Sequence, residues 1–556
     1  MNRIRTLTAM ATAAAAATAF VAAPASAAPS KGADNRNNNT SEKLRQAASA
    51  EEALKHLQAF QSIAEANAGS RASGTPGYDA SKDYLVAQLK AAGYTPEVQE
   101  FLFPFYEQLG DATLSLGGQP LATSTLTYSS SGTLTGGKLI PVDVNLTGTR
   151  ASTSGCEASD FAGLDFTGSN DVAVIQRGTC TFAVKVANAE AAGAEAVIIF
   201  NQGNTPARSV LLEGVTLGGP VGVPVVGASF ADGESLVAAS LTGTTVALST
   251  STISENRTTY NVLAQTSGNA DNVVMLGAHL DSVAAGPGIN DNGSGSAGIL
   301  EVALDMAKVK PTNAVRFAWW GAEELGLLGS EEYVATRTPE QLDDIALYLN
   351  FDMIASPNFV RFVYDGDNSD AVGAGAGPAG SDVIEDVFTN FFGAQGLASE
   401  GTDFSGRSDY GPFIAAGIDI PSGGLFTGAE EPKTAAQEAV YGGVAGASYD
   451  PCYHEVCDAL RNQVLTPADA AVYAELRAEY PMVGNVNMLA FEQNIDAIAH
   501  SVITFAYSTE TVNGEVGSNG NGKTNIRNAP GGGVNGGAGD PTGGGLHDDH
   551  HELLAS

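Results

Sequence analysis

Basic residues are scarce in this chain of 556 residues. Lysine and arginine total 27 against 62 aspartates and glutamates, which gives a formal net charge of −35. So acidic a surface repels nucleic-acid phosphates and anionic lipid headgroups. We therefore expect neither nucleic acid nor a membrane among the partners, and the acidity favours bound cations.

Cysteine is also scarce, with four in the whole chain. Four cysteines in an exported protein indicate two disulfides. Three pairings are formally possible, and proximity in the chain favours Cys156 with Cys180 and Cys452 with Cys457.

Long apolar runs are lacking after residue 27. Residues 1–27 have Arg3 and Arg5 at the start, an apolar middle and a small-residue end at Ala25-Ser26-Ala27, which is typical of a secretory signal peptide. No later run is long and apolar enough to span a bilayer. We expect a secreted, extracellular protein.

The length allows two or three domains, and changes of composition predict where they divide. After the signal peptide, we predict a polar segment over 28–44, helices and a strand over 45–111, a Ser/Thr/Gly-rich block with short extended runs over 112–245, an α/β block over 246–508, and a disordered Gly/Asn-rich tail over 509–556.

The α/β block alternates apolar runs with amphipathic stretches. We predict strands at 259–263, 273–276, 314–320 and 346–351, with a helix at 296–308. This alternation predicts an α/β fold with a mostly parallel open sheet sandwiched by helices.

Polar side chains follow these strands, where an open α/β sheet usually carries its site. They are His279, Asp291, Glu323, Glu324 and Asp352. So many buried carboxylates would repel one another unless cations neutralised them. Taken alone, the stretch around His279 and Asp291 is equally compatible with a helix-capping aspartate and a partly buried histidine.

A second histidine for such a site is found by elimination among the seven in the chain. Three lie in the tail, and His56 and His500 lie in predicted helices, which leaves His454 between Cys452 and Cys457. A disulfide across so short a loop constrains the unfolded chain by only about 2 kcal/mol, so orienting the loop explains it better. The alternative is a surface staple with an incidental histidine. Two histidines and three carboxylates suit two zinc ions, with cobalt or manganese as substitutes.

Five motifs carry a family resemblance. They are His279-Leu-Asp281, Asn290-Asp-Asn-Gly-Ser-Gly295, Gly321-Ala-Glu-Glu-Leu-Gly326, Asn350-Phe-Asp-Met353 and Cys452-Tyr-His-Glu-Val-Cys457. In this order they resemble the secreted bacterial di-zinc aminopeptidases of leucine aminopeptidase type, which are related to the glutamate carboxypeptidase and transferrin receptor superfamily. The resemblance covers about residues 45–110 and 250–508 and implies a zinc exopeptidase fold with its catalytic domain in two parts, 45–111 and 246–508.

The intervening block, 112–245, resembles the protease-associated domain, a small β-rich module often inserted into secreted peptidases. The stretch Arg177-Gly-Thr-Cys-Thr-Phe182 carries this resemblance. We expect a lid, a substrate-access element or a stability module, and a spacer without a role in turnover is the alternative.

The aminopeptidase resemblance implies a role for each metal ligand. Asp291 bridges two zinc ions, His279 and Asp352 complete one site, and Glu324 and His454 complete the other. Calcium is a further possible ion.

The same resemblance implies roles for residues around the metals. Glu323 is the general base, and Tyr453 donates a hydrogen bond to the developing oxyanion. Asp281 supports the ring of His279. Arg407 positions the substrate near its amino terminus, and Phe426 lines an apolar pocket for the first side chain.

The predicted function is release of single, large apolar residues from peptide amino termini by a monomeric enzyme. One alternative keeps the metals but changes the substrate, as in carboxypeptidase-like or glutaminyl-cyclase-like relatives. Another is a binding protein without catalysis, as in transferrin receptors; such proteins lose ligands, whereas all five ligand positions are intact here.

Overall fold

A computed structural model of the protein describes residues 37–515. The predicted signal peptide and most of the predicted tail lie outside the described residues. Among residues 37–515, no helix combines the length and the apolar character needed to cross a membrane.

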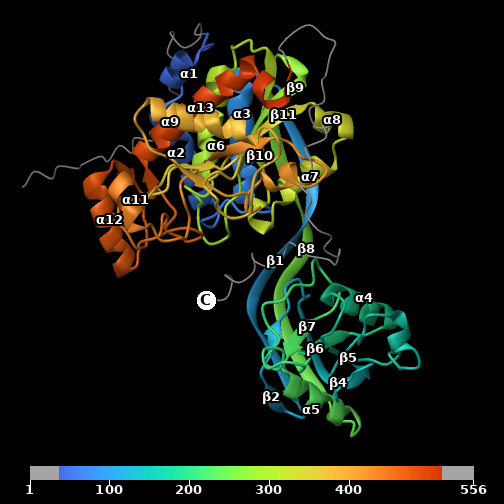
Figure 1. Ribbon diagram of the computed structural model, residues 1–556. Coiled ribbons are helices and arrows are strands. Elements are labelled where there is room, and N and C mark those ends of the chain that lie inside the picture. The colour runs from blue at the N-terminus through green and yellow to red at the C-terminus, as the bar shows by residue number, and fades with distance from the viewer. Residues whose placement is uncertain (1–36, 516–556) are drawn as a thin grey trace, which may run out of the picture. The chain divides into compact units, whose positions relative to one another are not determined.

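Four parallel strands form the centre of the large sheet (Figure 1). In spatial order they are β14 (Ser422–Phe426), β11 (Ile345–Phe351), β9 (Asn269–His279) and β10 (Asn313–Trp320). The predicted strands all fall within the observed ones, and β9 is longer than expected because it extends to His279. The mostly parallel sheet is therefore confirmed.

Antiparallel strands flank this centre on both sides. The long strand β8 (Val246–Gln265) pairs with β10 and, over most of its length, with β1 (Glu97–Leu116). On the other side β12 (Phe362–Tyr364) runs antiparallel to β14 and parallel to β13 (Glu400–Thr402). Strand β1 thus continues across the predicted boundary at residue 112.

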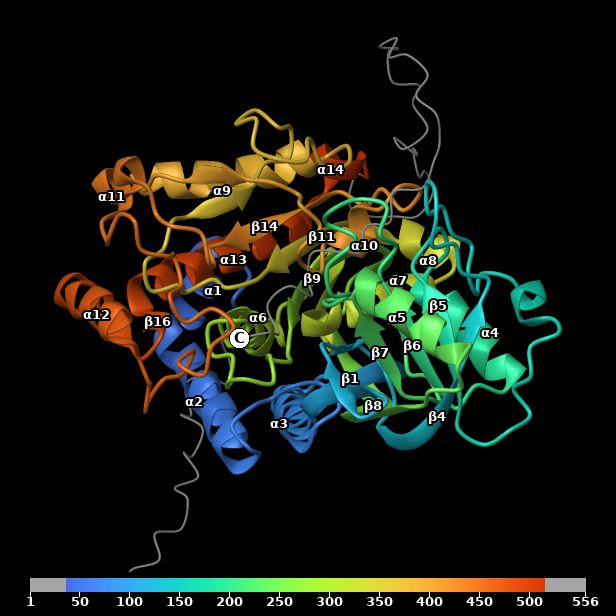
Figure 2. The same cartoon turned by 90° about the horizontal axis from the view of Figure 1, so that it is seen from below.

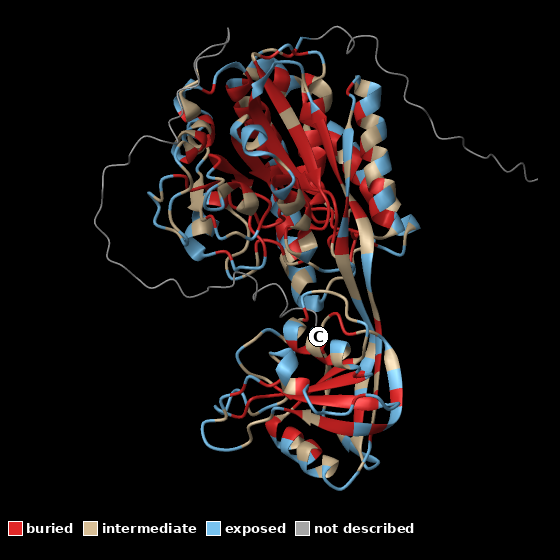
Figure 3. Ribbon diagram, turned by 90° about the vertical axis from the view of Figure 1, so that its right-hand side faces the viewer, coloured by how far each residue is buried: buried red, intermediate tan, exposed pale blue. Residues whose placement is uncertain are grey.

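Helices cover both faces of the sheet, because successive strand residues are apolar on both sides. In β9, Val274 and Leu276 belong to one core and Val273 and Met275 to the other. The first core packs against α2 (Ala50–Ala66), α3 (Pro76–Ala92), α6 (Gly293–Met306), α9 (Ser381–Ala394) and α13 (Met488–Tyr507), and the second against α7 (Leu328–Ala335) and α10 (Gly411–Ile414). Figure 2 shows α9 running beside β14, whereas α13 packs against β9 and β10, and Figure 3 shows that the central strands are buried. Helix α6 begins three residues earlier than predicted.

The strands of the inserted block continue the large sheet beyond β8. Strands β4 (Gly132–Val142), β5 (Asp171–Gln176), β6 (Ala196–Phe200) and β7 (Val225–Ala228) are parallel, and β4 also pairs with β8. Short strands β2 (Gln119–Leu121) and β3 (Ser124–Thr125), a 3-10 turn (Ala158–Phe161) and helices α4 (Phe182–Ala192) and α5 (Phe230–Ser240) complete it. The predicted disulfide between Cys156 and Cys180 is confirmed.

The chain is ordered beyond both predicted ends of the α/β unit. Asn38 is buried and donates to the Asp305 carbonyl at 2.9 Å, and α1 (Ser41–Ala47) buries Leu44. At the other end α14 (Glu510–Asn513) buries Val512. Parts of the predicted polar segment over 28–44 and of the predicted tail from 509 are thus helical. One buried apolar residue in each short helix is too weak a pattern to predict these helices from the sequence.

The other elements are short or peripheral. They are a 3-10 turn (Glu323–Leu325), α8 (Pro339–Asp343), α11 (Ala435–Tyr441), α12 (Pro467–Glu479), β15 (Met482–Val483) and β16 (Val486–Asn487).

Candidate metal centre

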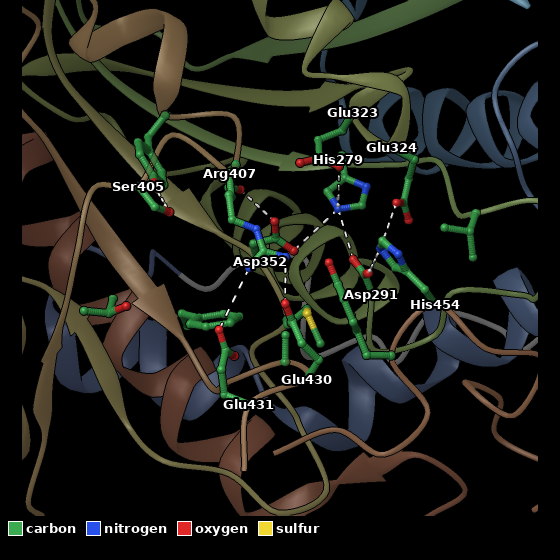
Figure 4. Close-up of a pocket in the computed structure, with 18 of the residues that line it drawn as sticks. His279, Asp291, Glu323, Glu324, Asp352, Ser405, Arg407, Glu430, Glu431 and His454 are labelled. Carbon is green, nitrogen blue, oxygen red and sulfur yellow. Dashed lines mark hydrogen bonds and ion pairs between the residues drawn. The ribbon is translucent and has the colours of Figure 1, made fainter. Parts of the chain in front are cut away.

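The carboxyl ends of the parallel strands bring four of the predicted residues to one edge of the sheet. Strand β9 ends at His279, which pairs in register with Trp320 at the end of β10. Glu323 and Glu324 lie in the 3-10 turn after β10, and Asp352 directly follows β11. All of them point into one cavity (Figure 4). The predicted convergence is therefore observed.

Asp291 reaches this edge from the loop before α6. Asn292 caps that helix by accepting a hydrogen bond from the Gly295 backbone N–H at 2.9 Å, and its amide donates to the Phe351 carbonyl at 3.0 Å. A Cβ at Gly295 would lie 2.1 Å from that carbonyl, so only glycine lets α6 approach β11 this closely.

His454 comes from the predicted disulfide loop, and the bond between Cys452 and Cys457 is confirmed. His454 has a left-handed backbone with φ of 58°, as do Ala322 (58°), before Glu323, and Met353 (48°), after Asp352. Non-glycine residues in this region are uncommon and concentrate at functional sites, where packing holds them.

Asp291 lies between the two histidines and presents one oxygen to each. Its Oδ1 is 3.2 Å from Nε2 of His279, and its Oδ2 is 3.3 Å from Nε2 of His454. His279 Nε2 is also 3.5 Å from Asp352 Oδ1, whereas His454 Nε2 is 3.1 Å from Glu324 Oε2. The five side chains therefore form two groups that share Asp291.

Charges within the site shift its pKa values. Burial disfavours the charged form of His279, but Glu323 and Asp352 outweigh burial and raise the pKa of its ring well above the ordinary value. Burial and the neighbouring Asp291 raise the pKa of Glu324 to about 7. Burial also raises the pKa of Glu323 well above its ordinary value. Burial and mutual repulsion thus disfavour the charged forms of these carboxylates unless bound cations neutralise them.

Two buried carboxylate oxygens of the site accept no hydrogen bond from the described residues. They are Glu324 Oε1 and Asp352 Oδ1. Buried polar atoms without partners are rare and call for an ion or water. A set of imidazole nitrogens and carboxylate oxygens suits zinc. The residues present therefore fit a pair of zinc ions.

Neighbouring polar groups orient the candidate ligands. Nδ1 of His279 is 3.3 Å from the carbonyl of Asp281 and 3.6 Å from its carboxylate, so the backbone oxygen is nearer than the predicted carboxylate contact. Asp281 instead accepts the Glu323 backbone N–H at 3.3 Å. On the other side, the Ser408 hydroxyl donates to Asp352 Oδ2 at 2.6 Å. We did not predict Ser408, although it follows Arg407 directly.

Arg71, also not predicted, supports the loop between His279 and Asp291. It is fully buried, and its guanidinium donates to the carbonyls of Pro287 (2.8 Å), Gly288 (2.6 Å) and Leu280. Burial lowers its pKa to about 10, so it stays charged at neutral pH.

The cavity in front of these residues measures about 630 Å³ and includes the remaining predicted site residues. Tyr453 and Phe426 line it, and the Phe426 ring stacks on Phe362 with centroids 6.0 Å apart. Arg407 also lines it and pairs with Glu430 at 2.9 Å (Figure 4).

Another acidic group lies apart from the cavity. Asp365, Asp367 and Glu385 have carboxylate oxygens within 4.8 Å of one another. Both oxygens of Asp365 already accept backbone N–H groups, from Ser369 at 2.9 Å and Asp370 at 3.0 Å. Backbone donors thus already stabilise the negative charge of Asp365, and a bound cation would add less here than at the centre around Asp291.

The sheet gathers two histidines and four carboxylates at its carboxyl-terminal edge, an arrangement that is typical of metal-dependent enzymes. Comparisons with known proteins identify the family. Residues 261–478 match peptidase family M28, and residues 136–236 match the PA domain. A protein of Pseudomonas aeruginosa (strain UCBPP-PA14) named aminopeptidase is 46% identical over 478 residues, which cover 84% of this chain and 83% of that protein.

Two further relatives are similar over most of their length. Leucine aminopeptidase 2 of Trichophyton tonsurans is 40% identical, covering 81% of this chain and 83% of that protein. The solved structure of an aminopeptidase from Aneurinibacillus sp. strain AM-1 is 26% identical, with a TM-score of 0.52, and covers 84% of this chain and 96% of that one. The chain belongs to peptidase family M28 and carries an inserted PA domain.

Proposed function

We propose that the protein is a zinc aminopeptidase that holds two zinc ions and releases single residues from peptide amino termini. The observation that carries the proposal is the position of Asp291, whose two carboxylate oxygens each face a different histidine at 3.2 and 3.3 Å. A carboxylate so placed is suited to bridge two cations. His279 and Asp352 would complete one site, and Glu324 and His454 the other.

When bound, a zinc pair polarises the scissile carbonyl and makes water acidic enough to lose a proton near neutral pH. Glu323 accepts that proton and delivers it to the leaving amine. Burial raises the pKa of Glu323 above its ordinary value, which makes its carboxylate a better proton acceptor. Tyr453 donates its hydroxyl hydrogen to the carbonyl oxygen; burial and nearby Asp291 raise its pKa, so it keeps that proton.

The substrate is a peptide with a free amino group and a large apolar first residue. The cavity offers Phe426, Met353 and Tyr364 as apolar walls for that side chain. Arg407, which lines the same cavity, helps to position the substrate, and its ion pair with Glu430 fixes its guanidinium. The name leucine aminopeptidase of the Trichophyton relative supports this preference.

Several further proposals concern the whole chain. Residues 1–27 direct export and are removed, so that a monomer acts outside the cell. The catalytic domain has two parts, 45–111 and 246–508, extended by α1 and α14, and the PA domain between them acts on access or stability.

Hydrolysis of leucine anilide, combined with metal analysis, tests the proposal. We expect turnover, loss of turnover when the amine is acetylated, about two zinc ions per chain, and reversible inactivation by a chelator. Equal activity on the acetylated substrate would contradict an aminopeptidase and favour a carboxypeptidase-like or cyclase-like relative. Zinc without any turnover would favour a binding protein.

A further inference from the structure

A buried pair of aspartates lies behind the candidate metal centre, outside the cavity. Asp458 is 2% exposed, and both its carboxylate oxygens accept backbone N–H groups of the neighbouring loop. The N–H of Asn290 lies 2.8 Å from Oδ1, and that of Asp291 lies 3.0 Å from Oδ2. Asp458 therefore holds the backbone of the shared carboxylate residue directly.

Asp450 makes the matching contacts at the other end of the disulfide loop. It is 1% exposed, its Oδ2 accepts the Asn290 side-chain amide at 2.7 Å, and its Oδ1 accepts the Cys452 backbone N–H at 2.9 Å. Asp450 precedes Cys452 by two residues and Asp458 follows Cys457 directly. The aspartates thus flank the loop that carries His454 and both bind Asn290.

Asn485 joins the two aspartates. Its side-chain amide donates to Asp458 Oδ1 at 2.7 Å and lies 3.0 Å from Asp450 Oδ2, while its own oxygen accepts the hydroxyl of Tyr473. Asn485 is fully buried. The single side-chain amide of Asn485 thus bridges the two buried carboxylates. Burying two carboxylates side by side is costly unless their oxygens accept hydrogen bonds.

We propose that Asp450, Asn485 and Asp458 form a clamp that positions the disulfide loop against the Asp291 loop and so sets the geometry of the site formed by His454, Glu324 and Asp291. The clamp rests on the proposed function, because it acts on a zinc site. Its residues are positioning residues that touch neither substrate nor zinc.

The clamp is selective because of where it holds the chain. His454 reaches Asp291 from a separate loop, whereas His279 and Asp352 lie at the ends of adjacent strands β9 and β11, which sheet hydrogen bonds already align. Loosening the clamp should therefore weaken the His454 site more than the site of His279 and Asp352, which depends on the clamp only through the shared Asp291. Groups that orient metal ligands typically change metal affinity by about 10- to 100-fold.

The test uses Asp458→Asn, which keeps the side-chain volume but places an NH2 group against backbone N–H donors. Zinc content and the rate of zinc loss to a chelator are measured on the full chain. We expect one of two zinc ions to be lost about 10- to 100-fold more readily, in the pattern given by His454→Ala and not by Asp352→Ala. Asp171→Asn, at a buried aspartate of the PA domain, is the matched control and should keep both ions.

Asn485→Ala removes the bridging donor and covers the case in which Asp458→Asn fails to fold. Thermal unfolding of the zinc-free proteins shows which variants are folded. Wild-type zinc retention in both folded variants, or equal weakening of both sites, would overturn the clamp. If the wild-type chain itself held fewer than two zinc ions, the proposed function would fail instead.

Discussion

Arg71→Met offers the most direct test of how the metal loop is supported. The guanidinium of Arg71 donates to three backbone carbonyls of the loop between His279 and Asp291 and is fully buried. Methionine fills the space of the stem but donates nothing. The substitution therefore leaves those carbonyls buried without a partner.

The magnitude follows from those contacts. A buried acceptor that loses its donor costs about 1–3 kcal/mol, and Arg71 serves three such carbonyls. The carbonyls belong to one loop and relax together, so their costs do not add in full. We expect the free energy of unfolding to fall by about 3–5 kcal/mol, and zinc to bind more weakly.

Thermal unfolding with and without zinc measures this loss. The matched control is Arg461→Met, because Arg461 makes an exposed ion pair with Glu65 on the surface. Exposed pairs contribute about 0–1 kcal/mol. Arg71→Lys keeps the charge and part of the hydrogen bonding, so its loss should be intermediate. The reasoning would be refuted if Arg71→Met were no less stable than Arg461→Met.

Three other substitutions or conditions have definite outcomes. Glu323→Gln should lower kcat by about 10²- to 10⁴-fold at unchanged zinc content, since it removes the base but no predicted ligand; retained turnover would exclude the assigned base. In the zinc-free protein, folding raises the pKa of Glu324 from 4.5 to about 7 and that of His454 from 6.5 to about 11, the latter because hydrogen bonds and charges of Asp291 and Glu324 outweigh burial. Both groups hold protons more tightly when folded, so their stabilisation is complete below about pH 4.5 and 6.5 and is lost as the pH rises through the folded values. The melting temperature of the zinc-free protein should therefore fall between pH 6 and 9, and a rise would contradict these signs. Replacing Cys452 and Cys457 by serine should lower the free energy of unfolding by about 2 kcal/mol and release zinc from the His454 site. Unchanged zinc retention would show that the disulfide does not position His454.

Much of the centre was predictable because each apolar strand is followed in the sequence by a polar candidate ligand. His279 and Asp352 directly follow apolar runs, and Glu323 and Glu324 come three and four residues after another. Parallel strands of one sheet end at the same edge, so a local pattern predicts a spatial cluster. His454 has no such strand, and the sequence pointed to it by elimination and by its two flanking cysteines.

The supporting residues were not predictable in this way. Arg71 meets its carbonyls more than 200 residues further along the chain, and Asp458 meets Asn290 across 168 residues. Neither an arginine in a Ser/Ala/Gly-rich stretch nor an aspartate after a cysteine differs locally from a surface residue. The ordered helices α1 and α14 escaped prediction for a related reason, since each buries a single apolar side chain.

The sequence by itself determined the α/β class and the types of side chain at the strand ends, because these depend on local periodicity and on runs of neighbouring residues. The inserted PA domain was expected from the resemblance carried by Arg177-Gly-Thr-Cys-Thr-Phe182. Only the tertiary structure decided that Asp291 turns one oxygen to each histidine, that the Asp281 carbonyl is nearer than its carboxylate to His279, and that buried Arg71 and Asp458 hold the loop from behind. Those relations depend on distances between separate loops. Such distances are set by how the whole core packs.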